Sequence, residues 1–139
     1  MVSRPRALPA GALRQGLSAE ILQDRACSET LDAAFTVHTA LGYAHDAETY
    51  RNALVHELKQ RGLPPLRHAS FSVIYKERVV GTYAADLLVE DRVLVQVVSE
   101  ETPMRNTGND LLRGLQNSDL QVGLLFNFGM PELSFARIL

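Results

Sequence analysis

The sequence predicts a single α/β domain whose mixed β-sheet is flanked by helices, with the element order ααβββαββ. Residues 28–42 and 46–62 repeat apolar side chains every three to four positions, which is the period of a helix. Phe71, Val73 and Tyr75 recur at every second position, which is the period of a strand. A chain of 139 residues, 46% of them hydrophobic, is large enough for one domain with a core.

Both predicted helices carry start and stop residues. Ser28 can cap the first helix and Gly42 follows its last turn. Asp46 can cap the second helix, and Gly62 lies beyond its end. The apolar stripes consist of Leu31, Ala34, Val37 and Leu41 in the first helix, and of Tyr50, Leu54 and Leu58 in the second. We therefore expect two helices that cover the sheet.

Three strands are expected after the helices. The alternating side chains that predict the first are Phe71, Val73 and Tyr75. A turn at 76–78 leads into a second strand at 79–89, and a tight connection at 90–92 leads into a third at 93–98. This part of the chain should therefore form an antiparallel set of neighbours.

The rest of the chain predicts one more helix and two more strands. Asn106 or Asn109 could cap a short helix that carries Leu111, Leu112 and Leu115. Residues 122–128 form an unbroken apolar run, which is typical of a strand buried on both faces. Leu133, Phe135 and Arg137 alternate in a last strand.

Residues 1–27 are expected to form an N-terminal arm, irregular or partly helical, ahead of the folded domain at 28–139. Three arginines precede the first acid, Glu20, as in organelle-targeting peptides, but the segment lacks a clear amphipathic repeat. With one cysteine, Cys27, the chain cannot form an internal disulfide, and this favours a reducing compartment. An intracellular, cytoplasmic protein is the simplest interpretation, with targeting by residues 1–19 as the alternative.

Charge and hydropathy limit the partners. The formal net charge is −2, whereas proteins dedicated to nucleic acids usually carry a basic surplus, so nucleic acid is a disfavoured partner. No stretch approaches the roughly 18 apolar residues that span a bilayer, so we expect a soluble chain without a membrane partner. His38, His45, His56 and His68 show no metal-ligand spacing and are expected to be exposed or hydrogen-bonded.

The segment 81–98 has the plan of a nuclease metal site with most of its chemistry removed. Asp86 lies on one predicted strand, and Gln96 and Val98 lie on the next. Hydrolysis at such a site needs two carboxylates for Mg²⁺ and a lysine that faces the same side, two residues along the strand. Gln96 is neutral and Val98 is apolar, so a lone Asp86 would hold Mg²⁺ weakly.

Several stretches of the chain resemble the GxxExxY (also written GxxExxR) family of the PD-(D/E)XK nuclease superfamily. The resemblance covers residues 31 to 138. The matching stretches are Ala33-Ala-Phe-Thr-Val-His38, Leu41-Gly42, Tyr50-Arg-Asn-Ala-Leu-Val-His-Glu-Leu58, Arg61-Gly62-Leu63, Val80-Gly81, Asp86-Leu-Leu-Val89 and Gly123-Leu-Leu-Phe-Asn-Phe-Gly129. The resemblance implies a PD-(D/E)XK nuclease-like fold.

The departures from the family fall on its functional positions. The residues that align with its Gly, Glu and Tyr signature are Ala44, Ala47 and Tyr50, and those that align with its strand Glu-x-Lys are Gln96, Val97 and Val98. A Gln and a Tyr of the family's later helix align with Asp110 and Gly114. Glu48 follows Ala47, but one step along a helix turns it about 100° away from the cleft. The resemblance therefore implies a pseudo-nuclease that keeps only Asp86.

We accordingly predict a catalytically inactive domain with no catalytic residue, no metal ligand and no cofactor. It would act as a structural, regulatory or assembly subunit that binds a protein partner or a second copy of itself. The positions of the former site, called the cleft residues below, are Ala47, Tyr50, Asp86, Gln96, Val98, Asp110 and Gly114. The Asp86 carboxylate should be hydrogen-bonded in the core or partly open to solvent, with Tyr50, Arg113 or a backbone N–H as its donor.

Two alternatives stay open at this stage. One is a Mg²⁺-dependent nucleic-acid-processing enzyme with a migrated site, built from Asp86, Gln96 and either Glu48 or Glu100. A cation for that site would come from Lys76, Arg78 or Arg105. The other is a module that binds nucleic acid without cleaving it.

Overall fold

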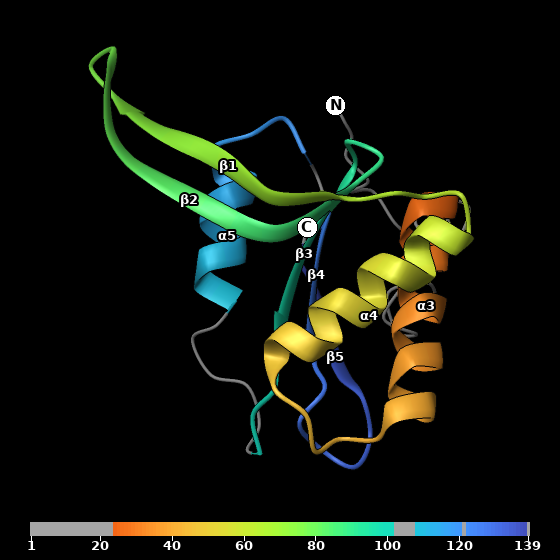
Figure 1. Ribbon diagram of the computed structural model, residues 1–139. Helices are drawn as coiled ribbons and strands as arrows, with labels where there is room; N and C mark the ends of the chain where they lie inside the picture. Colours follow the sequence, from red (N-terminus) through yellow and green to blue (C-terminus); the bar gives the residue numbers. More distant parts are fainter. Residues whose placement is uncertain (1–23, 102–107, 121, 139) are drawn as a thin grey trace, which may run out of the picture.

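The structure is a computed structural model that describes residues 24–101, 108–120 and 122–138, with the backbone alone described for 108–110. Figure 1 shows the arrangement of its helices and strands. The elements are α3 (Arg25–Leu41), α4 (Ala47–Gln60), β1 (Leu66–Tyr75), β2 (Arg78–Val89), β3 (Val93–Val98), α5 (Gly108–Gln116), β4 (Val122–Asn127) and β5 (Ser134–Ile138). Within these residues the predicted order ααβββαββ is confirmed.

The five strands form one mixed sheet, as predicted, in the order β1-β2-β3-β4-β5. Neighbours are antiparallel except for β3 and β4, which run parallel. A parallel pair needs a crossover connection, and α5 lies in that connection. Figure 1 shows α3 and α4 on one side of the sheet and α5 on the other. The fold is therefore a three-layer α/β arrangement.

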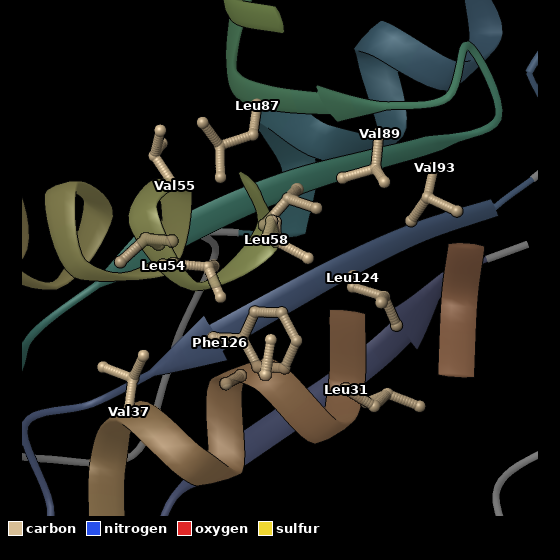
Figure 2. Close-up of a cluster of buried hydrophobic side chains, with 14 of the residues drawn as sticks. Leu31, Val37, Leu54, Val55, Leu58, Leu87, Val89, Val93, Leu124 and Phe126 are labelled. Carbon is tan, nitrogen blue, oxygen red and sulfur yellow. The ribbon is translucent and has the colours of Figure 1, made fainter. Parts of the chain in front are cut away.

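The larger core lies between the sheet and the pair α3 and α4. Figure 2 shows helix side chains meeting strand side chains there. The labelled members are Leu31, Val37, Leu54, Val55, Leu58, Leu87, Val89, Val93, Leu124 and Phe126, all of them buried. A smaller core on the other face joins Leu111 and Leu115 of α5 to Leu94 and Leu125. Each fully buried apolar side chain stabilises the fold by roughly 1.5–3 kcal/mol.

The start of α3 differs from the prediction. The helix begins at Arg25, and its cap is Asp24, whose side chain accepts a hydrogen bond from the Ala26 N–H at 2.9 Å. The prediction of Ser28 as the cap is wrong, because Ala26 and Cys27 extend the buried face by another turn. Residues 1–23 of the predicted arm lie outside the described residues.

The other helix ends agree with the sequence. Gly42 ends α3 with a φ of +79°, in the left-handed region that glycine favours. Asp46 caps α4 by accepting a hydrogen bond from the Thr49 N–H at 2.9 Å, and Gly62 follows the helix with a φ of +79°. The predicted cap Asp46 and both predicted glycine positions are therefore confirmed.

Three boundaries were predicted less well. β1 begins at Leu66, before the first residue of the alternating pattern, because its polar start pairs with the long partner strand β2. α5 begins at Gly108, so Asn109 lies inside the helix and the prediction of Asn109 as its cap is wrong, while Asn106 lies outside the described residues. β4 ends at Asn127, one residue before the end of the apolar run.

Strands β1 and β2 continue past the body of the domain as a long hairpin (Figure 1). Its far end carries four apolar side chains with at least 56% exposure, which are Ile74, Tyr75, Val79 and Val80. We call these residues the hairpin tip. A bulge lies between Val73 and Ile74, and Lys76 lies 5.4 Å from the centre of the Tyr75 ring. The hairpin tip is therefore an apolar surface that the domain itself does not cover.

No helix in the described part of the chain is long and apolar enough to cross a membrane.

Candidate functional site

Asp86 lies where strand β2 leaves its neighbour β3. The pairing of β2 with β3 includes Leu87 and Val95 but does not extend to Asp86, the residue next to Leu87. The Oδ2 atom of Asp86 accepts a hydrogen bond from the backbone N–H of Val97 at 2.6 Å. The side-chain carboxylate of Asp86 therefore accepts the Val97 N–H at a point where the backbones of β2 and β3 are no longer paired. Of the donors expected for Asp86, the backbone N–H is confirmed.

Arg51 of α4 supplies the positive charge of the cleft. Its Nη1 lies 3.5 Å from Asp86 Oδ1 and donates a hydrogen bond to the Val97 carbonyl at 3.4 Å. The side chains are only 22% exposed for Arg51 and 16% for Asp86, so water screens this pair weakly. Arg51 was not among the residues expected at the site, and its only local sign in the sequence is its three-residue spacing from Glu48.

Glu48 is connected to the cleft through Arg51. Its Oε1 accepts a hydrogen bond from the Arg51 Nε at 3.0 Å, and its Oε2 lies 3.4 Å from Nη2 of Arg67 on β1. Arg67 also donates to the Asn52 side chain at 3.0 Å. Helical geometry does turn Glu48 outward, where it is 56% exposed, yet its carboxylate reaches the guanidinium that faces Asp86. The residues Asp86, Arg51, Glu48 and Arg67 thus form a continuous chain of charges.

Tyr50 is buried and serves the core instead of Asp86. Its hydroxyl donates to the Gly42 carbonyl at 2.5 Å, so the prediction of Tyr50 as a donor to Asp86 is wrong. The His45 N–H in turn donates to the hydroxyl at 3.3 Å. The ring stacks on Phe128 with centroids 4.6 Å apart and an interplanar angle of 14°. Tyr50 therefore holds the turn between α3 and α4 against the end of β4.

The remaining cleft residues lie around this centre in different environments. Ala47 is the first residue of α4 and is half-buried. Gln96 and Val98 are half-buried on β3, and their two-residue spacing puts them on one face of the strand. Asp110 lies in the first turn of α5, but its side chain is outside the described structure.

Gly114 faces the smaller core. A Cβ atom at this position would lie 3.2 Å from a methyl group of Leu94 and 3.9 Å from the Phe71 ring. The family resemblance aligns a tyrosine with this position, but in this chain a glycine there lets helix α5 approach the sheet closely. Arg113, one residue earlier, lies 5.4 Å from the centre of the Tyr83 ring, an orientation that the sequence did not indicate.

Of the residues proposed for a migrated site, Asp86 and Glu48 are joined through Arg51, whereas the two described lysine and arginine candidates lie far along the hairpin. Lys76 and Arg78 lie on the turn side of the hairpin, and Arg105 lies outside the described residues. Glu100 is exposed, and its backbone is bound by the side chain of Asn127. Among the described residues, no three His, Cys, Asp or Glu side chains gather closely enough to hold a metal ion.

Asn127 and Gly129 give a structural reason for residues 123–129, one of the stretches that carry the family resemblance. Its buried side chain accepts hydrogen bonds from the N–H groups of Glu100 at 2.9 Å and Gly129 at 3.0 Å, and donates to the Glu100 carbonyl at 3.1 Å. A Cβ at Gly129 would lie 2.4 Å from the Glu100 nitrogen, so only glycine fits there. Both residues fix the segment that leaves β3, immediately after Val98.

The histidines and the cysteine have structural environments. His38 is buried with its Nε2 atom 2.9 Å from the Met130 carbonyl oxygen, whereas His45, His56 and His68 are exposed, as expected. Burial, and secondly the charge of Asp24, raise the pKa of the Cys27 thiol to about 12. The thiol is therefore protonated at neutral pH and is a poor nucleophile.

Comparison with known proteins agrees with this architecture. A family model described as the PD-(D/E)XK nuclease superfamily matches residues 24–138, which is most of the chain. Searches of curated proteins and of solved structures find no match.

Proposed function

Because this chain belongs to the PD-(D/E)XK nuclease superfamily, we propose that it is a catalytically inactive member that works by binding another protein. It would serve as a structural, regulatory or assembly subunit. The observation that carries the proposal is the state of the Asp86 carboxylate. Oδ2 accepts the Val97 N–H, and Oδ1 faces the guanidinium of Arg51. Each oxygen thus already has a partner within the chain, and a metal ion at Oδ1 would have to compete with the guanidinium of Arg51.

The chemistry of the neighbouring residues supports the same proposal. Mg²⁺ in hydrolytic sites is held by one or two carboxylates together with substrate phosphate oxygens. Gln96 provides an amide in place of a second carboxylate, and Val98 provides no positive charge on the same face of β3. A metal ion in this cleft would therefore meet one carboxylate and a nearby guanidinium of its own sign.

The hairpin tip supports a binding role. Its four side chains are exposed by at least 56%, and they gather on a hairpin that extends from the domain (Figure 1). Ile74 and Val79 pair across the hairpin and so lie on one face, and exposed apolar side chains gathered in this way often mark contact sites, because their exposure to water is unfavourable. A second copy of the chain is the first partner to test, since one apolar surface can meet its own copy around a two-fold axis.

The test of inactivity compares the unmodified protein with a triple variant, Ala47→Glu, Gln96→Glu and Val98→Lys. Binding of Mg²⁺ and Mn²⁺ is measured by calorimetry, and cleavage of single- and double-stranded DNA is assayed on the same preparations. We expect the unmodified protein to give neither binding nor cleavage, and the triple variant to bind metal. Circular dichroism of both proteins controls for folding.

Two results would point to the alternatives. Metal-dependent cleavage by the unmodified protein would establish a nucleic-acid-processing enzyme with a migrated site and would overturn the proposal. Binding of short duplexes without cleavage, with an affinity that falls steeply as salt rises, would establish a nucleic-acid-binding module. The net charge of −2 argues against that second result.

A further inference from the structure

The guanidinium of Arg51 gathers oxygen atoms from three separate elements. Its Nε binds Glu48 of α4 at 3.0 Å. Its Nη1 binds the carbonyl of Val97 on β3 at 3.4 Å and lies 3.5 Å from the carboxylate of Asp86 on β2. Two carboxylates and one backbone carbonyl thus converge on one cation that is part of the chain itself.

This set of oxygen atoms matches what a hard divalent cation requires. Mg²⁺ and Mn²⁺ prefer carboxylate, carbonyl and water oxygens, and Mg²⁺ sites commonly combine one or two carboxylates with waters and substrate phosphate oxygens. The guanidinium differs from a metal ion in two ways. It stays charged at every accessible pH, and it cannot dissociate from the protein. In the unmodified protein it therefore occupies these oxygen atoms, and only additional carboxylates, as at positions 47 and 96 of the triple variant, let a metal ion compete with it.

We propose that Arg51 is the resident cation of the cleft, and that its guanidinium keeps divalent metal ions away from Glu48, Asp86 and the Val97 carbonyl. The inference rests on the proposed function and deepens it, because it names the residue that closes the cleft to metal. The replaced positions Gln96 and Val98 weaken the site, whereas Arg51 fills it. Removal of Arg51 alone then uncovers a weak metal site.

Arg67 provides a matched control on the same network. It is the same residue type, it lies 3.4 Å from the same Glu48 carboxylate, and it also donates a hydrogen bond to the Asn52 side chain. Its side chain is 34% exposed, compared with 22% for Arg51. Loss of Arg67 removes one positive charge next to Glu48 but leaves the guanidinium of Arg51 in place.

The experiment titrates Mn²⁺ into the full chain and into its Arg51→Ala and Arg67→Ala variants, followed by electron paramagnetic resonance and by thermal unfolding. We expect saturable binding in Arg51→Ala with a dissociation constant on the order of 1 mM, the weak end for oxygen sites. At a tenfold excess over that constant the melting temperature should rise by roughly 5 °C. The full chain and Arg67→Ala should show neither effect.

Further variants make the outcome decisive. Arg51→Met keeps the aliphatic stem packed and repeats the test if Arg51→Ala does not fold, and Arg51→Lys, which keeps the charge, should again exclude Mn²⁺. Adding Asp86→Asn to the binding variant should abolish the site. Equal Mn²⁺ binding in the Arg51 and Arg67 variants would overturn the inference while leaving inactivity untouched. Cleavage by the unmodified protein would instead overturn the proposed function.

Discussion

The side chain of Asn127 is bound to both backbone polar groups of Glu100. Its Oδ1 accepts the Glu100 N–H at 2.9 Å and its Nδ2 donates to the Glu100 carbonyl at 3.1 Å. Asn127 is fully buried and both hydrogen bonds are partly buried, so water can replace them only incompletely. The amide therefore joins the end of β4 to the segment that follows β3.

Replacement of this amide should destabilise the domain strongly. We expect Asn127→Ala to lower the free energy of unfolding by about 2–4 kcal/mol, because the partly buried backbone groups of Glu100 and the buried N–H of Gly129 lose their partner. Urea denaturation measures the change. Asn117→Ala is the control, since the Asn117 side chain donates to the Arg113 carbonyl at an exposed helix end and should cost less than about 1 kcal/mol.

A methyl group at two different glycines should have unequal effects. In Gly129→Ala the new Cβ would lie 2.4 Å from the Glu100 nitrogen, so the backbone must move, at a cost of about 3 kcal/mol or more. In Gly42→Ala no atom of the described residues lies within 4 Å of the new Cβ, and only the backbone opposes the change, because a φ of +79° with a ψ of −158° is a conformation almost restricted to glycine, at a cost of about 1–3 kcal/mol. Equal melting temperatures for the two variants would contradict this account.

Arg61 should contribute to the contact between the two N-terminal helices. Its Nη1 lies 2.9 Å from Glu29 and 2.7 Å from Asp32, and its Nε lies 2.9 Å from Glu57. The pair with Glu57 was predicted from the i,i+4 spacing, and it is confirmed. Burial would lower the pKa of Arg61, but hydrogen bonds to Asp32, Glu57 and Glu29 raise it above its ordinary value.

We expect Arg61→Ala to lower the free energy of unfolding by about 1–2 kcal/mol, a modest figure because Asp32 is largely exposed. Denaturation in 0.05 M and roughly 1 M salt separates charge from packing, since salt screens the charge contribution. Lys59→Ala, at a neighbouring exposed position, should change stability by less than about 0.5 kcal/mol. An effect of Arg61→Ala equal to that of Lys59→Ala would show that the network stabilises nothing.

Cys27 should make stability depend on pH in the alkaline range. Its folded pKa is raised from 9.0 to about 12, so the folded state holds the proton while the unfolded state loses it. Its contribution is complete below pH 9 and is lost as the pH rises from 9 toward 12. The stability difference between the unmodified protein and Cys27→Ala should shrink by about 1.4 kcal/mol for each pH unit in that window. A difference that stays constant up to pH 11 would refute a raised pKa.

The hairpin tip should govern association and not stability. In the double variant Ile74→Ser and Val79→Ser, two exposed side chains are replaced, so the free energy of unfolding should change by less than about 1 kcal/mol. Light scattering after gel filtration should show that the unmodified protein self-associates with rising concentration and that the variant does not. Self-association that persists in the variant would place the contact elsewhere on the domain.

Much of the fold could be predicted from local patterns. The caps at Asp46 and Gly42 depend on neighbouring residues in the sequence, and so does the buried run of β4. The start of α3 was missed because Asp24 and Ser28 are equally good caps, and only packing of Ala26 and Cys27 decides between them.

Some residues of the cleft could be identified from the sequence, but the contacts between them could not. Asp86 could be identified from the motif on β2, whereas Arg51 could not, because its contact joins positions far apart in the chain. The same reason applies to Gly114, whose approach to Leu94 depends on how α5 crosses the sheet. Tertiary contacts of this kind leave no periodic trace in a sequence.

Because β3 and β4 are parallel, a crossover that contains α5 is synthesised between them, so β4 can join the sheet only late in synthesis. Helices α3 and α4 are complete long before β4 leaves the ribosome, and Phe126 of β4 belongs to the core that buries them. At 5–20 residues per second, their apolar faces wait on the order of 3 to 12 s for that strand. During this interval the nascent chain presents Leu54 and Leu58 to its surroundings, so its yield in a cell should depend on chaperones that shield such surfaces.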